Sequence, residues 1–307
     1  MISIIIPVFN SAKTIREVHH RLIGVLKVCG EPYEIIAVDN GSTDESRKIL
    51  QSLSPVTAVL LSKNFGENAA LDAGFKMAIG DFIITIDGEL ACNPEDVLPV
   101  LKKLKEGFGA VSGWRKGRQG SLYARILSSI ANAIISASTH VRLNDYSSSL
   151  KGYRREFIDG IQLLGNTSLF MPIFASDRGA RVAEIPISAS HGGRIRRRSV
   201  SDALCFLFDL VSVKFLLNYF SRPLRFFGSW AVFFGGLAVG AAIISIALKI
   251  LHSTVIHPVL LPLVGVMFVI LSIILFMLGF VTEILLRIYY ERKDNAPYLI
   301  YEVLKNK

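Results

Sequence analysis

Short apolar runs alternate with polar segments of helical spacing over the first hundred residues. Strands are predicted at "ISIIIPVF", "YEIIAVD", "VTAVLLS" and "DFIITID". Helices are predicted between them, from about Ala12 to Val28, from about Thr43 onward, and near Asn68 to Ile79. This rhythm is typical of an α/β domain with a mostly parallel sheet and helices on both faces. Ligands bind beyond the carboxyl ends of such strands, where Asp39 and Asp87 stand.

Two long apolar stretches lie further along the chain. Phe226 to Leu251 contains one charged residue, Lys249, and Pro258 to Thr282 contains none. Each is longer than the roughly 20 residues that cross a bilayer, so a transmembrane hairpin over residues 226–282 is predicted; a buried pair of core helices is the alternative. Lysines and arginines flank the hairpin on both sides, whereas the link "HSTVIH" has neither. By the positive-inside rule, both ends of the hairpin and the sheet domain are expected in the cytoplasm.

Two amphipathic segments precede the hairpin. In residues 121–138 apolar side chains recur at helical spacing, and residues 201–225 form a more apolar segment interrupted by charges. Beside a membrane hairpin, such helices are expected to lie in the membrane interface; packing in a soluble core is the alternative. The predicted order is a sheet domain over residues 1–200, which includes the first of these helices, then the second interface helix, the hairpin, and a cytoplasmic tail over residues 283–307.

Composition narrows the class of partner. The 307 residues are 51% hydrophobic and carry a formal net charge of +9. A positive balance favours nucleic acid, phosphorylated ligands or an acidic membrane surface as partners. Because the basic residues cluster beside the membrane segments, no nucleic-acid partner is expected.

The acidic pair Asp87 and Glu89 directly follows the fourth apolar run, in "TIDGEL". Two carboxylates one residue apart can both offer oxygens to a hard divalent cation. Such a cation would neutralise a diphosphate and help it to leave. Most isolated Asp-x-Glu pairs are solvated turns, but this pair ends a strand of a nucleotide-type sheet, which favours a metal site.

Several motifs make the chain similar to a known family. They are "SIIIPVFN", "EIIAVDNGSTDES", "LLSKNFGENAALDAGFKMAIGDFIITIDGEL", "NPED", "NDYSSSLKGYRREF", "AEIPI", "SRPLRFFGSW" and "GFVTEILLRIYYERKDNAPYLI". Through them the chain resembles the inverting family 2 glycosyltransferases of GT-A (Rossmann-like) fold, and among these the polyisoprenyl-phosphate glycosyltransferases, over nearly its whole length. That group includes bactoprenol glucosyltransferase, dolichol-phosphate mannose synthase and undecaprenyl-phosphate aminoarabinose transferase. The segments "DYSSSLKGYRRE" and "FMPIFA" resemble the aminoarabinose branch most.

The resemblance implies a binding site for the sugar donor. Asp87 and Glu89 fall on the Asp-x-Asp motif of the family, which holds Mg²⁺ or Mn²⁺ and the donor diphosphate. Asp39 matches the acid that contacts the nucleotide base, usually uracil. Pro7 and Asn10 match the loop that borders this base.

The resemblance also implies residues that bind phosphates. Arg115 and Arg125 match catalytic basic residues that grip the lipid phosphate, with Ser129 one helical turn beyond Arg125. Arg194 and Arg198 lie in a basic loop that closes over the donor diphosphate. A solvated loop that binds anionic lipid head groups is the other interpretation of this arginine run.

The chain departs from the family pattern near the metal motif. It reads "DGELA" where the family usually reads "DADLQ", so that Glu89 replaces an aspartate and Ala91 replaces a glutamine. Asn40 replaces the second aspartate of "DDGSTD". A looser metal site, or one of altered metal preference, is therefore expected.

As a function, the resemblance implies inverting transfer of a single sugar from a nucleotide-sugar, with a UDP-sugar favoured, to undecaprenyl or another polyprenyl phosphate. The enzyme would be a multi-pass protein of the bacterial inner membrane, with the catalytic domain and both termini cytoplasmic. A downstream flippase would move the product, which would modify a surface glycan, lipopolysaccharide or lipid A. The alternative is a catalytically silent scaffold that binds lipid phosphate.

The identity of the sugar stays open among glucose, galactose, N-acetylhexosamine and a 4-amino-pentose derivative. The oligomeric state also stays open, because Gly235, Gly236 and Gly240 in the first span allow close packing either within the hairpin or in a homo-oligomer. One hairpin is too small to form a sugar-conducting pore, which argues against a processive polysaccharide synthase.

Overall fold

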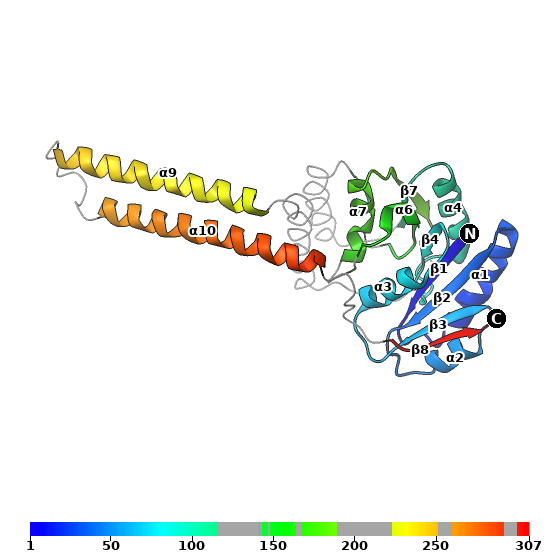
Figure 1. Cartoon of the computed structure of the whole chain (residues 1–307). Coiled ribbons are helices and arrows are strands. Elements are labelled where there is room, and N and C mark those ends of the chain that lie inside the picture. Colours follow the sequence, from blue (N-terminus) through cyan, green and yellow to red (C-terminus); the bar gives the residue numbers. More distant parts are fainter. Residues whose placement is uncertain are drawn as a thin grey trace. The chain divides into compact units, whose positions relative to one another are not determined.

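The structure of the chain is a computed structural model that describes residues 1–115, 141, 143–146, 148–161, 163, 167–188, 223–250, 260–291 and 300–306. The chain divides into two compact units, Met1–Val213 with Ala296–Lys307, and Lys214–Asn295. The first unit contains the sheet, and the second contains two long helices (Figure 1).

An eight-stranded sheet organises the described part of the first unit, in the order β7-β5-β6-β4-β1-β2-β3-β8. Its strands are β1 (Ile2–Val8), β2 (Tyr33–Asp39), β3 (Val56–Leu61), β4 (Phe82–Thr85), β5 (Ala110–Arg115), β6 (Lys151–Arg154), β7 (Val182–Ile187) and β8 (Ile300–Asn306). Strand β1 is parallel to both β2 and β4, β2 is parallel to β3, and β5 is parallel to β7. The pairs β4–β6, β5–β6 and β3–β8 are antiparallel. The predicted mostly parallel α/β sheet is confirmed.

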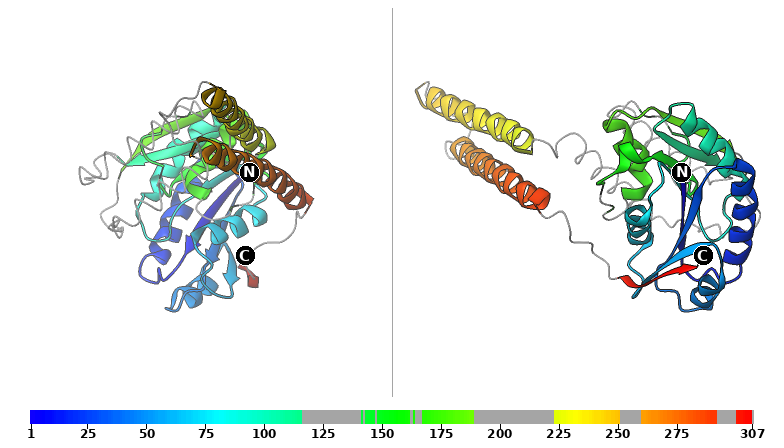
Figure 2. Two further views of the ribbon diagram at one scale, coloured as in Figure 1. Left: turned by 90° about the vertical axis from the view of Figure 1, so that its left-hand side faces the viewer. Right: turned by 45° about the vertical axis from the view of Figure 1, so that its right-hand side comes forward.

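Helices cover both faces of this sheet (Figure 2). They are α1 (Ile15–Cys29), α2 (Ser46–Ser52), α3 (Glu67–Met77), the short 3₁₀ helix η1 (Pro94–Asp96), α4 (Val97–Lys105), α6 (Arg155–Ile158), η2 (Thr167–Phe170) and α7 (Met171–Asp177). Along β1, Ile4 and Ile6 pack in a core shared with α1 and α4, whereas Ile5 packs in a second core with α3 and α7. Because both faces of the strand are buried, its sequence is a nearly continuous apolar run.

Strand β8 closes one edge of the sheet with residues that follow the two long helices. It pairs with β3, from Val56 opposite Asn306 to Leu61 opposite Ile300. The Asn306 side chain also donates hydrogen bonds to carbonyl oxygens at the end of α2, among them that of Gln51 at 2.9 Å. These residues were predicted to lie in the cytoplasmic tail over residues 283–307, and the strand was not predicted. The chain therefore returns to the sheet after its helical pair.

The second unit is the pair α9 (Pro223–Ile250) and α10 (Leu260–Glu291), which lie side by side (Figures 1 and 2). The stretches Leu224–Ile250 and Leu260–Leu285 are long and apolar enough to cross a membrane, with mean hydropathies of 2.3 and 2.9. Only 17% and 11% of their most apolar windows are buried within the structure. This exposure disagrees with a buried pair of core helices and agrees with the predicted hairpin.

A small residue brings the two helices together. A Cβ on Gly235 would lie 3.4 Å from Ser272 Oγ, and this hydroxyl donates to the Ala231 carbonyl oxygen at 2.7 Å. Gly235 thus serves packing within the hairpin. The first predicted interface helix, over residues 121–138, lies outside the described residues, as does the second, over residues 201–225, except for its last three residues, which begin α9.

Candidate functional site

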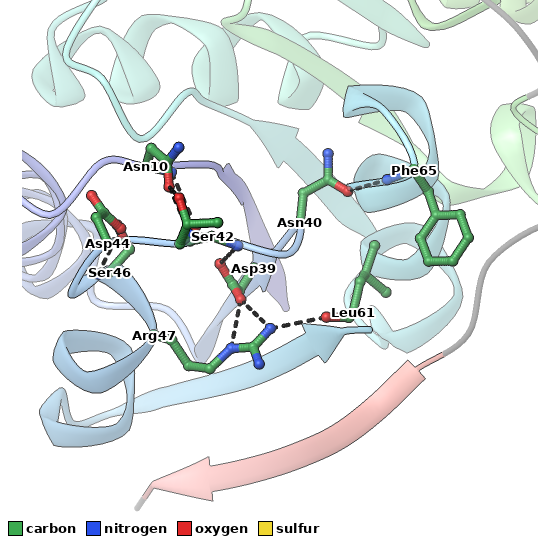
Figure 3. Close-up of polar contacts among 10 residues, drawn as sticks. Asn10, Asp39, Asn40, Ser42, Asp44, Ser46, Arg47, Leu61 and Phe65 are labelled. Atoms are coloured by element: carbon green, nitrogen blue, oxygen red, sulfur yellow. Dashed lines mark hydrogen bonds and ion pairs between the residues drawn. The ribbon is translucent and has the colours of Figure 1, made fainter. Parts of the chain in front are cut away.

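Hydrogen bonds join the loop after β1 to the loop after β2 (Figure 3). Asn10 has a backbone φ of 52°, and its N–H donates to Ser42 Oγ at 3.0 Å. Its side-chain Oδ1 accepts from the Thr43 N–H at 2.9 Å. Pro7 is half-buried in β1, opposite Val38 of β2. The two residues that were predicted to border a nucleotide base therefore lie near the end of β1 and in the loop after it, beside the loop after β2.

Asp39, the last residue of β2, has a fully buried side chain and a cationic partner (Figure 3). Arg47 Nε donates to Asp39 Oδ2 at 2.9 Å, and a second guanidinium nitrogen lies 2.8 Å from the same oxygen. Asp39 Oδ1 accepts from the Ser42 N–H at 3.1 Å. The Arg47 guanidinium also donates to the Leu61 carbonyl oxygen at 2.9 Å. The negative charge of Asp39 is thus balanced by a neighbour on α2.

A cavity of about 410 Å³ lies at these strand ends. The residues that line it are Phe9, Gly41, Ser42, Thr43, Arg47, Ser62, Lys63 and Asn64. Gly41 has a φ of +70°, and a Cβ there would lie 2.3 Å from the Lys63 carbonyl carbon, so the crossing of the two loops requires glycine. The volume is within the range of small-molecule sites.

Asn40 links the loop after β2 to the loop after β3. Its Nδ2 donates to Asn64 Oδ1 at 3.0 Å, and its Oδ1 accepts from the Phe65 N–H at 3.0 Å. An amide supplies both a hydrogen-bond donor and an acceptor, whereas an ionised carboxylate only accepts. The asparagine that departs from the family pattern therefore has a structural use at this position.

Asp87 follows β4, and three neutral groups donate hydrogen bonds to its carboxylate. Oδ1 accepts from the N–H groups of Glu89 at 2.9 Å and Ala91 at 3.0 Å, and Oδ2 accepts from the Ser149 hydroxyl. None of the ion pairs within 4.0 Å in the described part of the chain involves Asp87. The carboxylate is held in one orientation; among the described residues it has no ion-pair partner, although Arg115 is near enough to interact with it electrostatically.

The loop that carries Asp87 is also fixed from the start of α1. The Thr14 hydroxyl donates to the Gly88 carbonyl oxygen at 2.6 Å and makes no capping hydrogen bond to its own helix. Leu90 has a left-handed φ of 56°, which turns the chain back. Contacts from two other parts of the fold therefore set the position of the acidic pair.

The acidic pair offers hard oxygen ligands. Glu89 is half-buried, and its carboxylate accepts no hydrogen bond from the described residues. Mg²⁺ typically binds through one or two protein carboxylates, substrate phosphates and water, so Asp87 and Glu89 fit such an ion. Among the described residues, no cluster of three or more His, Cys, Asp and Glu side chains could hold a metal ion. The remaining ligands would come from substrate and water.

Arg115 ends β5 and forms a bidentate ion pair. Its Nε and a terminal nitrogen donate to the two carboxylate oxygens of Asp145, at 2.8 and 3.1 Å. Burial opposes the charge, but the hydrogen bonds to Asp145 and the nearby acidic groups of Asp145, Cys92 and Asp87 together raise the pKa of Arg115 above its usual value. Arg115 is thus a permanently charged group with a fixed direction.

Two further buried groups lie in and beside β6. Burial lowers the pKa of Lys151 to about 8, and its ammonium donates to the carbonyl oxygens of Ser168 and Leu169, at 3.0 and 3.3 Å. Burial raises the pKa of the Cys92 thiol, and Cys92 Sγ lies 3.4 Å from Ser149 Oγ. Neither group was identified from the sequence.

Four predicted site residues, Arg125, Ser129, Arg194 and Arg198, lie outside the described residues. The structure instead adds the partners that hold the predicted residues, namely Arg47, Thr14, Asp145 and Ser149. No local pattern marks these partners, because each acts through a contact between separate parts of the fold.

Comparison with known proteins agrees with this arrangement. Residues 3–162 match the family described as "Glycosyl transferase family 2". The chain is 30% identical to the undecaprenyl-phosphate 4-deoxy-4-formamido-L-arabinose transferase of Klebsiella pneumoniae, over 99% of this chain and 94% of that one. It is 29% identical to the dodecaprenyl-phosphate galacturonate synthase of Rhizobium johnstonii, over 100% of this chain and 94% of the other.

Solved structures show the same fold. The glucosyl-3-phosphoglycerate synthase of Mycobacterium tuberculosis, in complex with Mn²⁺, UDP and glucosyl-3-phosphoglycerate, matches with a TM-score of 0.55 and 20% identity over 70% of this chain and 78% of that chain. The same enzyme in complex with Mg²⁺ and UDP matches with a TM-score of 0.54 and 19% identity, over 70% of this chain and 78% of that chain. Because the family match spans residues 3–162, and the Klebsiella relative is 30% identical over nearly the whole chain, this protein belongs to glycosyl transferase family 2 and is a glycosyltransferase with a GT-A fold.

Proposed function

We propose that this enzyme transfers one sugar from a UDP-sugar to undecaprenyl phosphate, with inversion, at the cytoplasmic face of the inner membrane. The observation that carries the proposal is the carboxylate of Asp87, which is held rigidly at the end of β4 without an ion-pair partner among the described residues. Such a charge suits a divalent cation that bridges to a donor diphosphate.

The nucleotide would occupy the cavity between the loops after β1, β2 and β3. Its volume of about 410 Å³ suits a base and ribose, and Phe9 and Arg47 supply an aromatic face and a guanidinium. The Mycobacterium tuberculosis enzyme of the same fold binds UDP with Mn²⁺ or Mg²⁺, which supports a uridine nucleotide and either metal here. Direct contact of Asp39 with the base stays a prediction, because Arg47 and Ser42 bond both of its oxygens.

The acceptor would be a lipid phosphate monoester. Both named bacterial relatives carry a polyprenyl phosphate in their names, which supports this class of acceptor. The second pKa of a phosphate monoester is about 6, so the acceptor is largely a dianion at neutral pH and needs no strong general base. It does need positive charge around it, because two anions must approach each other. Arg115, oriented by Asp145, would supply part of this charge, and Arg125 and Ser129 are proposed to act with it.

Displacement at the anomeric carbon would proceed in line, with the acceptor oxygen forming a bond as the bond to the diphosphate breaks. An α-linked donor would then give a β-linked lipid phosphosugar. Asp87 and Glu89 would hold Mg²⁺ or Mn²⁺, which supplies charge to stabilise the leaving nucleoside diphosphate. Arg194 and Arg198 are proposed to close over that diphosphate.

The fold supports a membrane hairpin with both ends on one side. Helices α9 and α10 are each long enough to span a bilayer, and β8, which follows them, pairs with β3 of the sheet domain. An even number of crossings is required if the chain leaves the sheet domain and returns to it. With the basic flanks of the hairpin, this supports a multi-pass protein with its catalytic domain and both termini in the cytoplasm.

The test is a transfer assay on the full chain in detergent micelles. Undecaprenyl phosphate is offered with a panel of UDP-sugars, with Mg²⁺, Mn²⁺ or EDTA. Transfer of a single sugar that requires a divalent metal is expected, and its anomeric configuration would be read by NMR. A folded protein that binds undecaprenyl phosphate but neither binds nor uses any nucleotide-sugar would contradict the proposal and favour a silent scaffold.

A further inference from the structure

Ser149 stands where β4 and β6 come together, directly beside Asp87. It precedes β6, and its carbonyl oxygen accepts a hydrogen bond from Thr85 Oγ, at the end of β4, at 3.1 Å. Its hydroxyl reaches the Asp87 carboxylate and also lies 3.4 Å from the Cys92 sulfur. Ser149 is thus the contact that joins the acidic loop to a strand that is distant in sequence.

The direction of these hydrogen bonds follows from the chemistry of the groups. An ionised carboxylate can only accept, so the one hydroxyl hydrogen of Ser149 points to Asp87 Oδ2. The Cys92 thiol must then donate to Ser149 Oγ. A carboxylate has about four lone-pair positions in all. Three of them are taken by Glu89, Ala91 and Ser149, which leaves a position on Oδ2 for a cation.

We propose that Ser149 is a positioning residue of the metal site, whose hydroxyl holds Asp87 Oδ2 in the orientation that meets the cation. This inference rests on the proposed function, because it assumes that Asp87 is a metal ligand. Hydrogen bonds to ligating carboxylates orient them and tune metal affinity, and their loss typically weakens metal binding about 10- to 100-fold. Among the described residues, the Ser149 hydroxyl is the side-chain group that donates a hydrogen bond to the Asp87 carboxylate.

A purely architectural use of this hydroxyl is poorly supported. Strands β4 and β6 are already paired through four residues each, from Phe82 opposite Arg154 to Thr85 opposite Lys151. The Thr85 hydroxyl adds a bond to the Ser149 backbone. The pairing of β4 with β6 therefore does not require the Ser149 hydroxyl, which instead donates its hydrogen bond to the Asp87 carboxylate.

The experiment measures Mn²⁺ binding by the full chain in detergent, by the EPR signal of free Mn²⁺ during titration in the presence of UDP. Ser149→Thr and Ser149→Val have nearly the same shape, but only threonine keeps a hydroxyl. Ser148→Ala is the matched control, because the adjacent Ser148 hydroxyl contacts the Leu150 carbonyl oxygen at 3.4 Å instead of Asp87. Thermal unfolding of each variant without metal checks that it is folded.

Ser149→Val is expected to weaken Mn²⁺ binding by about 10-fold or more, while Ser149→Thr and Ser148→Ala stay within about 3-fold of the unchanged protein. If valine and threonine variants bind Mn²⁺ equally well, or if valine binds it more tightly, the inference about Ser149 is wrong and the proposed function stands. If the unchanged protein shows no Mn²⁺ binding with UDP, the metal site fails and the inference fails with it.

Discussion

Two aspartates lie at the carboxyl ends of two strands of the same sheet, but the groups that contact their carboxylates differ. Asp39, after β2, is fully buried and paired with the Arg47 guanidinium. Asp87, after β4, is half-buried and bonded by two backbone N–H groups and the Ser149 hydroxyl. Asp39 has an ion-pair partner in Arg47, whereas the carboxylate of Asp87 has none among the described residues and is held by neutral donors.

The difference separates a carboxylate whose charge is already paired from one that has no ion-pair partner among the described residues. A buried charge is tolerated when an opposite charge and hydrogen bonds accompany it, and removing one partner leaves the other uncompensated. A carboxylate held by neutral groups keeps most of its attraction for a cation from outside. Similar positions at strand ends therefore do not imply similar roles.

The largest effect is expected from Asp87→Asn. The amide keeps nearly the same shape but lacks the charge that holds the cation, so the rate of sugar transfer should fall by roughly 10³-fold. The thermal unfolding midpoint should change little, because Asp87 forms no ion pair with any described residue. Transfer assays and thermal unfolding on the same preparation check both. Normal activity in Asp87→Asn would remove the metal role from this residue.

Asp39→Asn should act mainly on stability. It leaves the Arg47 charge without its partner, at a cost of about 2 kcal/mol in the free energy of unfolding, lower than for a fully buried pair because 32% of the Arg47 side chain is exposed. The unfolding midpoint should fall by about 6 °C. The double variant Asp39→Asn/Arg47→Gln should recover part of this loss, since no charge is then left unpaired. Equal loss in the single and double variants would show that the ion pair is unimportant.

Glu89 is predicted to be the second carboxylate of the metal site. Glu89→Gln should weaken Mn²⁺ binding by about 10-fold. Even the loss of a group that only hydrogen-bonds to a metal ligand typically has an effect of this size. Glu89→Asp should retain most of the affinity, because it restores the Asp-x-Asp pattern of the family. Mn²⁺ titration followed by EPR distinguishes the two. Equal affinity in both variants and in the unchanged protein would place Glu89 outside the metal site.

The smallest effect is expected for Lys151. Its ammonium, like the Asp87 carboxylate, forms hydrogen bonds with neutral groups, the Ser168 and Leu169 carbonyl oxygens. Its pKa is about 8 in the folded protein and 10.5 for an ordinary lysine, because burial disfavours the charged form; Glu67 and Asp145 oppose this shift, and Arg115 adds to it. Between these values the unfolded chain binds more protons, so the free energy of unfolding should rise with pH.

Relative to Lys151→Met, the unchanged protein should gain about 1 kcal/mol between pH 8 and pH 9. Denaturant unfolding of both proteins at each pH measures this difference, and contributions from groups that both proteins share, such as Cys92, cancel. A difference that is constant with pH would mean that Lys151 is not deprotonated in the folded protein in this range.

The sequence was sufficient to locate the two aspartates at the strand ends, but it did not reveal the residues that form hydrogen bonds and ion pairs with them. Asp39 and Asp87 could be located because each follows an apolar run that is buried on both faces of the sheet. Such a run can be recognised from the sequence alone. Ser149 is 62 residues from Asp87 and meets it only through the antiparallel pairing of β4 with β6. Strand β8 was missed because its sequence "IYEVLKN" mixes charged with apolar residues and its apolar side chains are largely exposed, so it lacks the continuous apolar run of the buried strands.

The measurement that tests the central claim most directly is UDP affinity with and without Mn²⁺ for the unchanged protein, Asp87→Asn and Asp39→Asn/Arg47→Gln. We predict that Mn²⁺ strengthens UDP binding by a similar factor in the unchanged protein and in the double variant, even where the loss of Arg47 from the nucleotide cavity lowers the affinity without metal. We predict that Asp87→Asn loses this dependence on Mn²⁺ while remaining folded. A dependence of UDP affinity on Mn²⁺ that survives in Asp87→Asn and is lost in a double variant that still binds UDP would contradict this assignment, because Asp39 would then be the carboxylate on which the metal depends.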